Sequence, residues 1–276
     1  MLRDKFALIG IIVYVLAFTV ALFANQLAPF DPQEILFTEN GKMAANLAPT
    51  AEHPLGTTNL GRDIYSQLVI SSRSALIVGL TAAFFVVVVG SLVGVISGFF
   101  GGWVDVVLMR VTDVAFGIPF LPFVIVLAAF LKPSIWNVVI AMALILWRDT
   151  ARVIRAQVLS LRERQYVEAA RALGSGPLRI MFTHIVPNVT PMAFLYGSIA
   201  IGWAILTEAS VSFLGFGDPT VMSWGFMLQD AYSSQALSRG AFYWFVPPGV
   251  AIVLLVTAGF FISRGYEEVL MPRLKE

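Results

Sequence analysis

Long apolar stretches separated by short charged segments constrain the fold of this chain more than any other feature. Six such stretches lie at 6–23, 75–99, 114–131, 135–146, 192–214 and 242–262. The hydrocarbon core of a bilayer is about 30 Å thick, so a helix that crosses it needs roughly 20 apolar residues. The fourth stretch is too short alone, but Asp149, Arg152 and Arg155 follow it, where a helix can leave the lipid and continue into water. The sequence therefore predicts six membrane helices.

The composition agrees with a membrane protein. Of the 276 residues, 58% are hydrophobic and 13% are charged, and the mean hydropathy is +0.82. Soluble proteins usually carry about 25% charged residues. We expect an all-α membrane protein in which residues 1–74 form a first transmembrane helix and an external segment. Residues 75–276 are expected to form a five-helix core with a cytoplasmic loop at about 148–190.

Several functional classes are disfavoured by what the sequence lacks. The formal net charge is +1 and no long basic tract is present, which argues against nucleic-acid binding. The absence of cysteine excludes a disulfide framework and a Cys-ligated metal site. No G-x-x-x-x-G-K-S/T loop is present to hold phosphates, so we expect no ATP hydrolysis and no cofactor in this chain.

The distribution of lysine and arginine predicts the orientation in the membrane. With six spans both termini share one side, and that side collects thirteen of the eighteen basic residues. They are Arg3, Lys5, Arg110, Arg148, Arg152, Arg155, Arg162, Arg164, Arg171, Arg179, Arg264, Arg273 and Lys275. Because basic residues concentrate in cytoplasmic segments, both termini are expected in the cytoplasm.

Two of the expected external segments, 25–74 and 215–240, are long. Each can receive a soluble partner, and each can instead act as a lid that seals the helix bundle. The sequence alone leaves both interpretations open.

The most basic part of the chain is the cytoplasmic loop. Within it Tyr166, Ala169, Ala170 and Leu173 recur at helical spacing, which predicts an apolar face on a short helix. This face either docks a partner protein or packs onto the membrane domain.

A turn and a second helix are expected directly afterwards. Gly174 stands where a helix commonly ends in a left-handed residue, and Ser175-Gly176-Pro177 predicts a new helix start. The loop is therefore predicted to be a helix-turn-helix that projects into the cytoplasm.

The order Glu168-Ala169-Ala170, Gly174 and Ile185-Val186-Pro187-Asn188 resembles the EAA loop of ABC importer permeases. The general pattern of that family has Ile and Leu where this chain has His184 and Val186. With His184 the segment is similar to the dipeptide, oligopeptide and nickel subgroup. His184 itself is either a structural residue with a hydrogen-bond partner or, less simply, a proton switch.

The resemblance implies a type I permease subunit of an ATP-driven importer in the cytoplasmic membrane of a prokaryote. It implies a homologous second permease, two ATP-binding subunits that hold ATP and Mg, and an extracytoplasmic solute-binding protein. Peptides are the leading cargo of the family, with oligosaccharides and metal chelates as alternatives. In the family this loop contacts an ATP-binding subunit, and the corresponding positions here are Tyr166, Glu168, Ala169, Ala170, Arg171, Leu173 and Gly174.

Two features of the remaining chain give structural predictions. Gly90, Gly94, Gly98 and Gly102 recur every four residues, which predicts a stripe where a neighbouring helix approaches closely. Arg110 and Asp113 are expected to form a charge pair at a cytoplasmic turn.

Glu208 is the one acid well inside an apolar stretch, which makes it a candidate for the substrate pathway. Solvation at an outer vestibule, or a hydrogen bond that fixes the turn after Ser212, explains it equally well.

Two other classes of protein are weighed against the importer. A self-sufficient secondary transporter or channel would carry paired charges or broken helices at the membrane midplane, and apart from Glu208 none is recognised. An intramembrane hydrolase would need a Ser/His pair or metal ligands at membrane depth, and the chain holds only His53 and His184.

Overall fold

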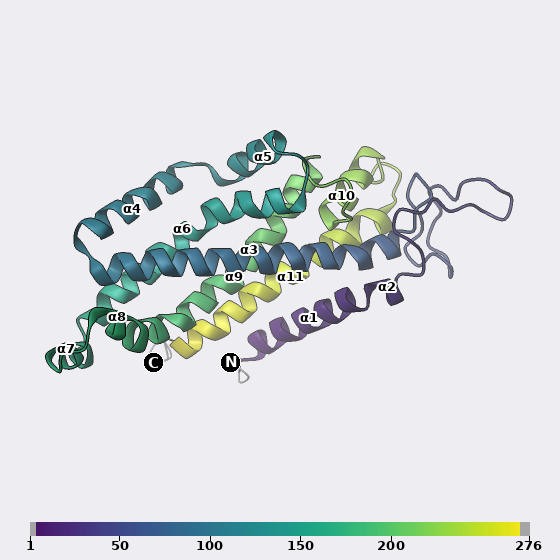
Figure 1. The fold of residues 1–276 in the computed structure, drawn as a ribbon. Helices are drawn as coiled ribbons and strands as arrows, with labels where there is room; N and C mark the ends of the chain where they lie inside the picture. Colours follow the sequence, from purple (N-terminus) through teal and green to yellow (C-terminus); the bar gives the residue numbers. More distant parts are fainter. Residues whose placement is uncertain (1–3, 271–276) are drawn as a thin grey trace.

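The computed structural model describes residues 4–270, which form long helices lying side by side along one direction (Figure 1). The long helices are α1 (Lys5–Leu22), α3 (Ile64–Phe100), α6 (Ile135–Arg162), α9 (Val186–Phe213) and α11 (Phe242–Leu270). The shorter ones are α2 (Ala24–Leu27), α4 (Gly102–Gly117), α5 (Phe120–Phe130), α7 (Gln165–Ala172), α8 (Pro177–Ile180) and α10 (Trp224–Ser233), with a π-helix, η1 (Met181–Ile185), between α8 and α9. Arg3, Arg273 and Lys275, which the charge count includes, lie outside the described residues.

Four helical segments are long and apolar enough to cross a membrane: 5–22, 64–100, 177–213 and 242–267. A fifth crossing is possible if α4 and α5, which are bent by 83° relative to each other, act as one broken span. The 28-residue α6 is long enough, but Arg148, Asp149 and Arg152 interrupt its apolar half. The all-α membrane architecture is confirmed, whereas six crossings are not established by length and hydropathy.

The third apolar stretch is not the single helix that was predicted. The chain breaks at Ile118 and Pro119, and the helix before the break begins already at Gly102. Proline lacks an N–H and disfavours the helical conformation of the preceding residue, and Ile118 accordingly has ψ 122°. The expectation that no helix is broken was therefore wrong.

The second apolar stretch begins earlier than predicted, at Ile64 instead of residue 75. Asp63 caps the helix, because its carboxylate accepts a hydrogen bond of 2.7 Å from the Ser66 N–H. The polar residues of this extension are buried and bonded, with Gln67 donating to the Pro32 carbonyl at 3.0 Å and Ser74 to the Met222 carbonyl at 2.8 Å. The expected division between residues 74 and 75 falls within this helix.

The predicted glycine stripe is confirmed, and its neighbour is α6. A Cβ added to Gly90, Gly94 or Gly98 would meet atoms of α6 at 2.6–2.8 Å. Successive glycines meet Thr150, Ile154 and Val158 in that order, so α3 and α6 run in the same direction. Gly102 is not part of the stripe, since it begins α4 with open space around it.

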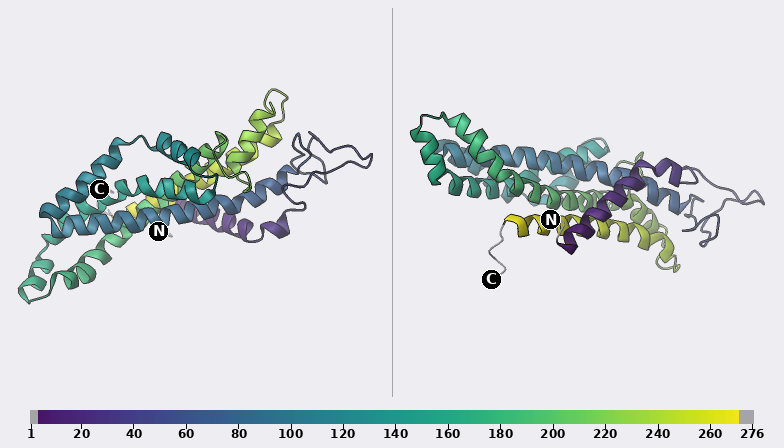
Figure 2. Two further views of the ribbon diagram at one scale, coloured as in Figure 1. Left: turned by 45° about the horizontal axis from the view of Figure 1, so that its top comes forward. Right: turned by 90° about the horizontal axis from the view of Figure 1, so that it is seen from below.

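The other long helices alternate in direction around this pair. α9 runs antiparallel to α3, since Gly79 approaches Ile201 and Gly197 approaches Val87. The next contacts continue the alternation, with Gly259 of α11 against Ser198 and Gly10 of α1 against Ala258. As a result, α1 begins and α11 ends toward the end of the bundle from which α7 and α8 project, opposite the loops at 28–63 (Figure 2).

Replacing Gly94 by Ala is expected to destabilise the bundle. The new Cβ would lie 2.6 Å from the Ala151 carbonyl oxygen and 2.8 Å from the Ile154 Cβ. Overpacking of this kind costs about 1–3 kcal/mol. We expect a lower melting temperature of the detergent-solubilised protein.

The matched control is Gly249→Ala on α11, where nothing lies within 4 Å of the added Cβ. Because alanine favours helix, this variant should melt at or slightly above the wild-type temperature. Equal melting temperatures for the two variants would contradict the close packing of α3 on α6.

Candidate functional site

The predicted helix-turn-helix is confirmed. α7 ends at Ala172, Gly174 has φ +81°, and Pro177 occupies the first position of α8. The two helices project from one end of the bundle (Figures 1 and 2).

The face of α7 that was predicted to be apolar is divided between the protein interior and the surface. Tyr166 is 43% exposed and Leu173 is 86% exposed, and Ala169 is exposed between them. Ala170 instead turns inward beside Val167, and both pack into the same buried cluster as Ile180. Prediction from spacing missed the anchoring role of Val167, whose apolar side chain beside Tyr166 was the available signal.

The outward surface of α7 also carries charge. Glu168 and Arg171 are exposed, as is Gly174 at the turn. The structure thus brings six of the seven positions carried over from the EAA loop to the surface, and it places Ala170 beneath them.

His184 connects this loop to the start of α9. Its ring centroid lies 6.0 Å from that of Tyr166, and its backbone oxygen accepts a hydrogen bond of 2.7 Å from the Asn188 amide. Pro187 follows the π-helix and has no N–H for a helical hydrogen bond. The His184 ring therefore contacts Tyr166, whereas the hydrogen bond is made by its backbone.

Four arginines on one stripe of α6 bind neighbouring helices. Arg162 donates to the Gly98 carbonyl at 3.1 Å, and Arg155 binds both carboxylate oxygens of Asp105 at 2.5 Å. Their spacing along α6 places them over α3 and α4. The loop is therefore connected directly to the packed helices, because α7 follows α6 after two residues.

The other two arginines hold the break between α4 and α5. Arg148 donates to the carbonyls of Ala115 and Ile118, and Arg152 pairs with Asp113 at 2.8 Å. Inside a membrane, carbonyls released by a helix break need protein donors, and Arg148 supplies them. The predicted pair of Arg110 with Asp113 at a turn was wrong, because both residues lie within helix α4 and Asp113 pairs with Arg152 of α6.

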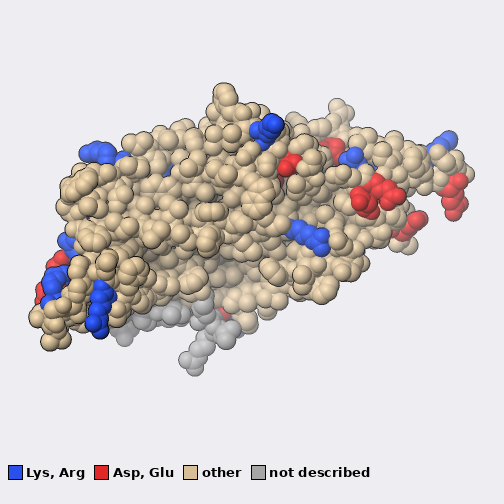
Figure 3. All heavy atoms as spheres, viewed as in Figure 1, with Lys and Arg blue, Asp and Glu red and all other residues tan. Residues whose placement is uncertain are grey.

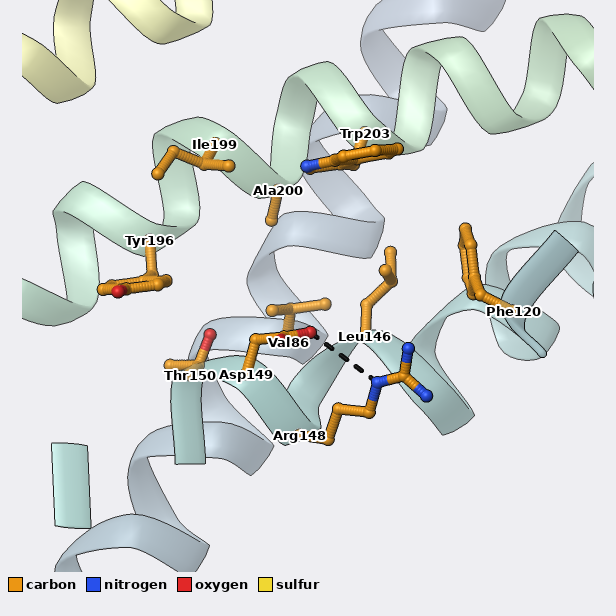
Figure 4. A pocket seen from close by; sticks show the side chains of 10 residues that line it. All are labelled: Val86, Phe120, Leu146, Arg148, Asp149, Thr150, Tyr196, Ile199, Ala200 and Trp203. Atoms are coloured by element: carbon orange, nitrogen blue, oxygen red, sulfur yellow. Dashed lines mark ion pairs between the residues drawn. The ribbon is translucent and has the colours of Figure 1, made fainter. Parts of the chain in front are cut away.

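A half-open cavity of about 390 Å³ lies beside this break, between α3, α5, α6 and α9 (Figure 4). Tyr196 and Trp203 of α9 form one wall, and Phe120 at the start of α5 forms another. Arg148 and Asp149 lie opposite α9, with 3.7 Å between the Arg148 Nε and a carboxylate oxygen of Asp149. The sequence analysis did not single out these aromatic residues, because nothing in their spacing distinguishes them from lipid-facing ones.

Glu208 does not line this cavity. Its side chain is buried, with 5% of the residue exposed, and it accepts a hydrogen bond of 2.7 Å from Ser212. This placement favours the interpretation that Glu208 fixes the turn after α9.

The opposite end of the molecule is a cap made from both long segments expected to be external. Arg239 donates to the Asn46 side chain at 2.8 Å, and the Trp224 indole donates to the Leu68 carbonyl at 3.0 Å. Burial raises the pKa of the Asp230 carboxyl on α10, and the nearby Arg62 partly opposes this shift. The exposed acids Asp31, Glu34, Glu39 and Glu52 gather at this end, while basic residues cluster around α7 (Figure 3).

Long apolar helices around a half-open, partly charged cavity define an integral membrane protein of the transporter class. Comparison with known proteins gives the family: residues 90–276 match the binding-protein-dependent transport system inner membrane component, and the chain belongs to this family.

Full-length relatives agree with this family. A candidate peptide permease of Brucella suis is 36% identical over 99% of this chain and 88% of its own length. The oligopeptide transport system permease protein OppC of Bacillus subtilis is 33% identical over 99% of this chain and 87% of its own. The glutathione transport system permease protein GsiD of Pectobacterium atrosepticum is 32% identical over 99% and 89%.

Replacing Gly174 by Ala is expected to loosen the helix-turn-helix. A side chain at φ +81° costs about 1–2 kcal/mol even though no atom lies within 4 Å of the added Cβ. Trypsin cleavage at Arg171 or Arg179 of the folded protein should become several-fold faster. Gly176→Ala is the control, because Gly176 has φ −65° and equally open surroundings. Identical cleavage rates in both variants would refute a need for glycine at the turn.

Proposed function

We propose that this chain is the transmembrane permease subunit of an ATP-driven importer. It forms a solute pathway with a homologous second permease, and it couples through the α7 loop to ATP-binding subunits, two of which serve the pair of permeases. ATP and Mg bind in those subunits, and an extracytoplasmic solute-binding protein delivers the solute. The family to which the chain belongs supports a transport component of this kind.

The observation that carries the proposal is the exposed apolar surface on a projecting helix. Val167 and Ala170 fix one side of α7 to the bundle, while Leu173 at the tip is 86% exposed. Leaving a leucine side chain in water instead of burying it forgoes about 1.5–3 kcal/mol. A partner that covers Leu173 and Tyr166 recovers this free energy, and the exposed Glu168 and Arg171 provide charges for orientation.

The arrangement also favours six crossings with both termini in the cytoplasm. The long helices and the α4–α5 pair alternate in direction along the chain, so α6 is a crossing if its neighbours are. Its arginines are bonded to α3 and α4, which offsets their cost at membrane depth. The basic α7 end faces the cytoplasm on the charge rule, and the acidic cap faces outward.

Coupling follows from the continuity of α6. A displacement of α7 by closing ATP-binding subunits moves α6, and the arginine contacts carry α4 and the break at Pro119 with it. Shifting a two-state equilibrium from 1:99 to 99:1 requires about 5.5 kcal/mol of differential binding, so the α7 contact must be extensive.

Peptides are the solute class that we propose. The relatives are named for peptide, oligopeptide and glutathione transport, and all of them align over nearly the whole chain. Oligosaccharides and metal chelates remain the alternatives, because the solute-binding protein selects the cargo.

The test is a single substitution at the tip of α7. Leu173→Asp places a charge on a side chain that is 86% exposed, so the fold should be unaffected. When tagged protein is purified from membranes with its neighbours, we expect loss of the ATP-binding subunits and of ATPase activity. Leu60→Asp at the opposite cap, where Leu60 is 41% exposed, is the matched control and should retain both.

The competing function has a distinct outcome. A secondary transporter is compatible with the broken α4–α5 pair, since such proteins use broken helices. If the wild-type chain purifies alone and moves solute in liposomes without ATP, the importer proposal is wrong. Retention of ATP-binding subunits by Leu173→Asp would show that α7 is not their contact.

A further inference from the structure

The cavity between α5, α6 and α9 lies at membrane depth. Gly90 of α3 packs on Thr150 of α6, next to Asp149. From Gly90 to Phe100, ten residues further toward the α7 end, α3 carries no charged side chain. At the rise of an α-helix this apolar distance is about 15 Å. Asp149 therefore lies deeper in the membrane than predicted, since α6 was expected to leave the lipid at this residue.

The Asp149 carboxylate is exposed at this depth. Its side chain is 55% exposed, and within residues 4–270 no hydrogen bond is donated to it. An ionised carboxylate facing lipid is expensive, so the space in front of it holds water or protein. The half-open cavity is thus a mostly apolar surface with a charged group, which faces water or protein and not lipid.

Arg148 forms an ion pair with this carboxylate but donates no hydrogen bond to it. Its guanidinium is engaged by the Ala115 and Ile118 carbonyls, its side chain is only 14% exposed, and its Nε has no hydrogen-bond partner. The distance of 3.7 Å from Nε to Asp149 is too long for a hydrogen bond. The Asp149 carboxylate oxygens are therefore left as hydrogen-bond acceptors for an incoming solute.

The remaining surface is mostly apolar, and three of its residues are aromatic. Tyr196 and Trp203 come from α9, Phe120 comes from α5, and their rings border the space in front of Asp149 (Figure 4). Aromatic faces attract cations as well as apolar groups. A volume of about 390 Å³ falls within the range of small-molecule sites, which is about 300–1,000 Å³.

We propose that this cavity is a binding station on the solute pathway for a positively charged amino group next to an apolar side chain, as at the amino end of a short peptide. Asp149 accepts the ammonium group, and Tyr196, Trp203 and Phe120 contact the apolar part. The proposal rests on the transport function proposed above and adds the residues of this chain that contact the solute after the solute-binding protein has delivered it.

The first test uses the absence of cysteine, which leaves an introduced thiol as the only one in the chain. Ile199→Cys places it in the cavity wall, and the full-length chain is labelled in membranes with its neighbours present. Cationic and anionic methanethiosulfonates of similar size are compared, each normalised to its reaction with free mercaptoethanol. We expect the cationic reagent to react about fivefold faster, because Asp149 attracts it.

Charge variants assign this preference to Asp149. In the Ile199→Cys background, Asp149→Asn should abolish the ratio and Asp149→Glu should retain it. Two further thiols give the limits of reactivity. Leu173→Cys on the exposed tip of the loop should react fully, and Leu16→Cys, on the apolar span α1 where Leu16 is 60% exposed, should react least. The proposal is overturned by a ratio that survives Asp149→Asn, or by an Ile199→Cys thiol that is as unreactive as the Leu16→Cys thiol.

The second test measures selection in the ATP-driven complex reconstituted in liposomes. A peptide with a free amino end and its N-acetylated form are compared as solutes. We expect Asp149→Asn to lower uptake of the free peptide several-fold while uptake of the acetylated form is unchanged. Equal effects on both forms overturn the station for an amino group. The thiol test needs neither ATP nor a transported solute. It can therefore contradict the binding station while the Leu173→Asp result still supports the importer, and the Leu173→Asp result can contradict the importer while the thiol test supports the station.

Discussion

The close approach of α3 to α6 is the contact on which the rest of the structure depends. Gly90, Gly94 and Gly98 let the two backbones pack without intervening side chains. This brings the arginine stripe of α6 within reach of the Gly98 carbonyl and of Asp105 at the start of α4. The position of α4, the break after it and the cavity beside the break all follow from this one contact.

The same arrangement joins the two regions for which we propose functional roles. At one end of α6 is the exposed α7 surface, and about four turns in from its other end are the charges of the cavity. A helix that is packed on α3 and bonded to α4 cannot bend freely between these regions. Under the proposed function, a movement of the loop therefore reaches the cavity through α6 alone.

Local patterns predicted the local structure well. The glycine repeat, the turn at Gly174 and the helix start at Pro177 depend on backbone conformation and appear directly in residue type. The broken span was missed because the apolar run continues through Pro119, although the proline was a signal. The roles of Arg148 and Asp149 were missed because they are set by contacts with α4 and α9, and sequence spacing carries no information about those partners.

The hydrogen bonds from Arg148 to the α4–α5 break affect the order in which the helices can assemble during biosynthesis. The carbonyls of Ala115 and Ile118 precede Arg148 in the chain by 33 and 30 residues, so they can enter the membrane before α6 has packed beside them. Until α6 follows, water, lipid headgroups or the insertion machinery must solvate that kink. The nascent chain therefore passes through a stage in which α1 and α3 are placed but the α4–α5 break is not yet held, and the packing of α6 completes it.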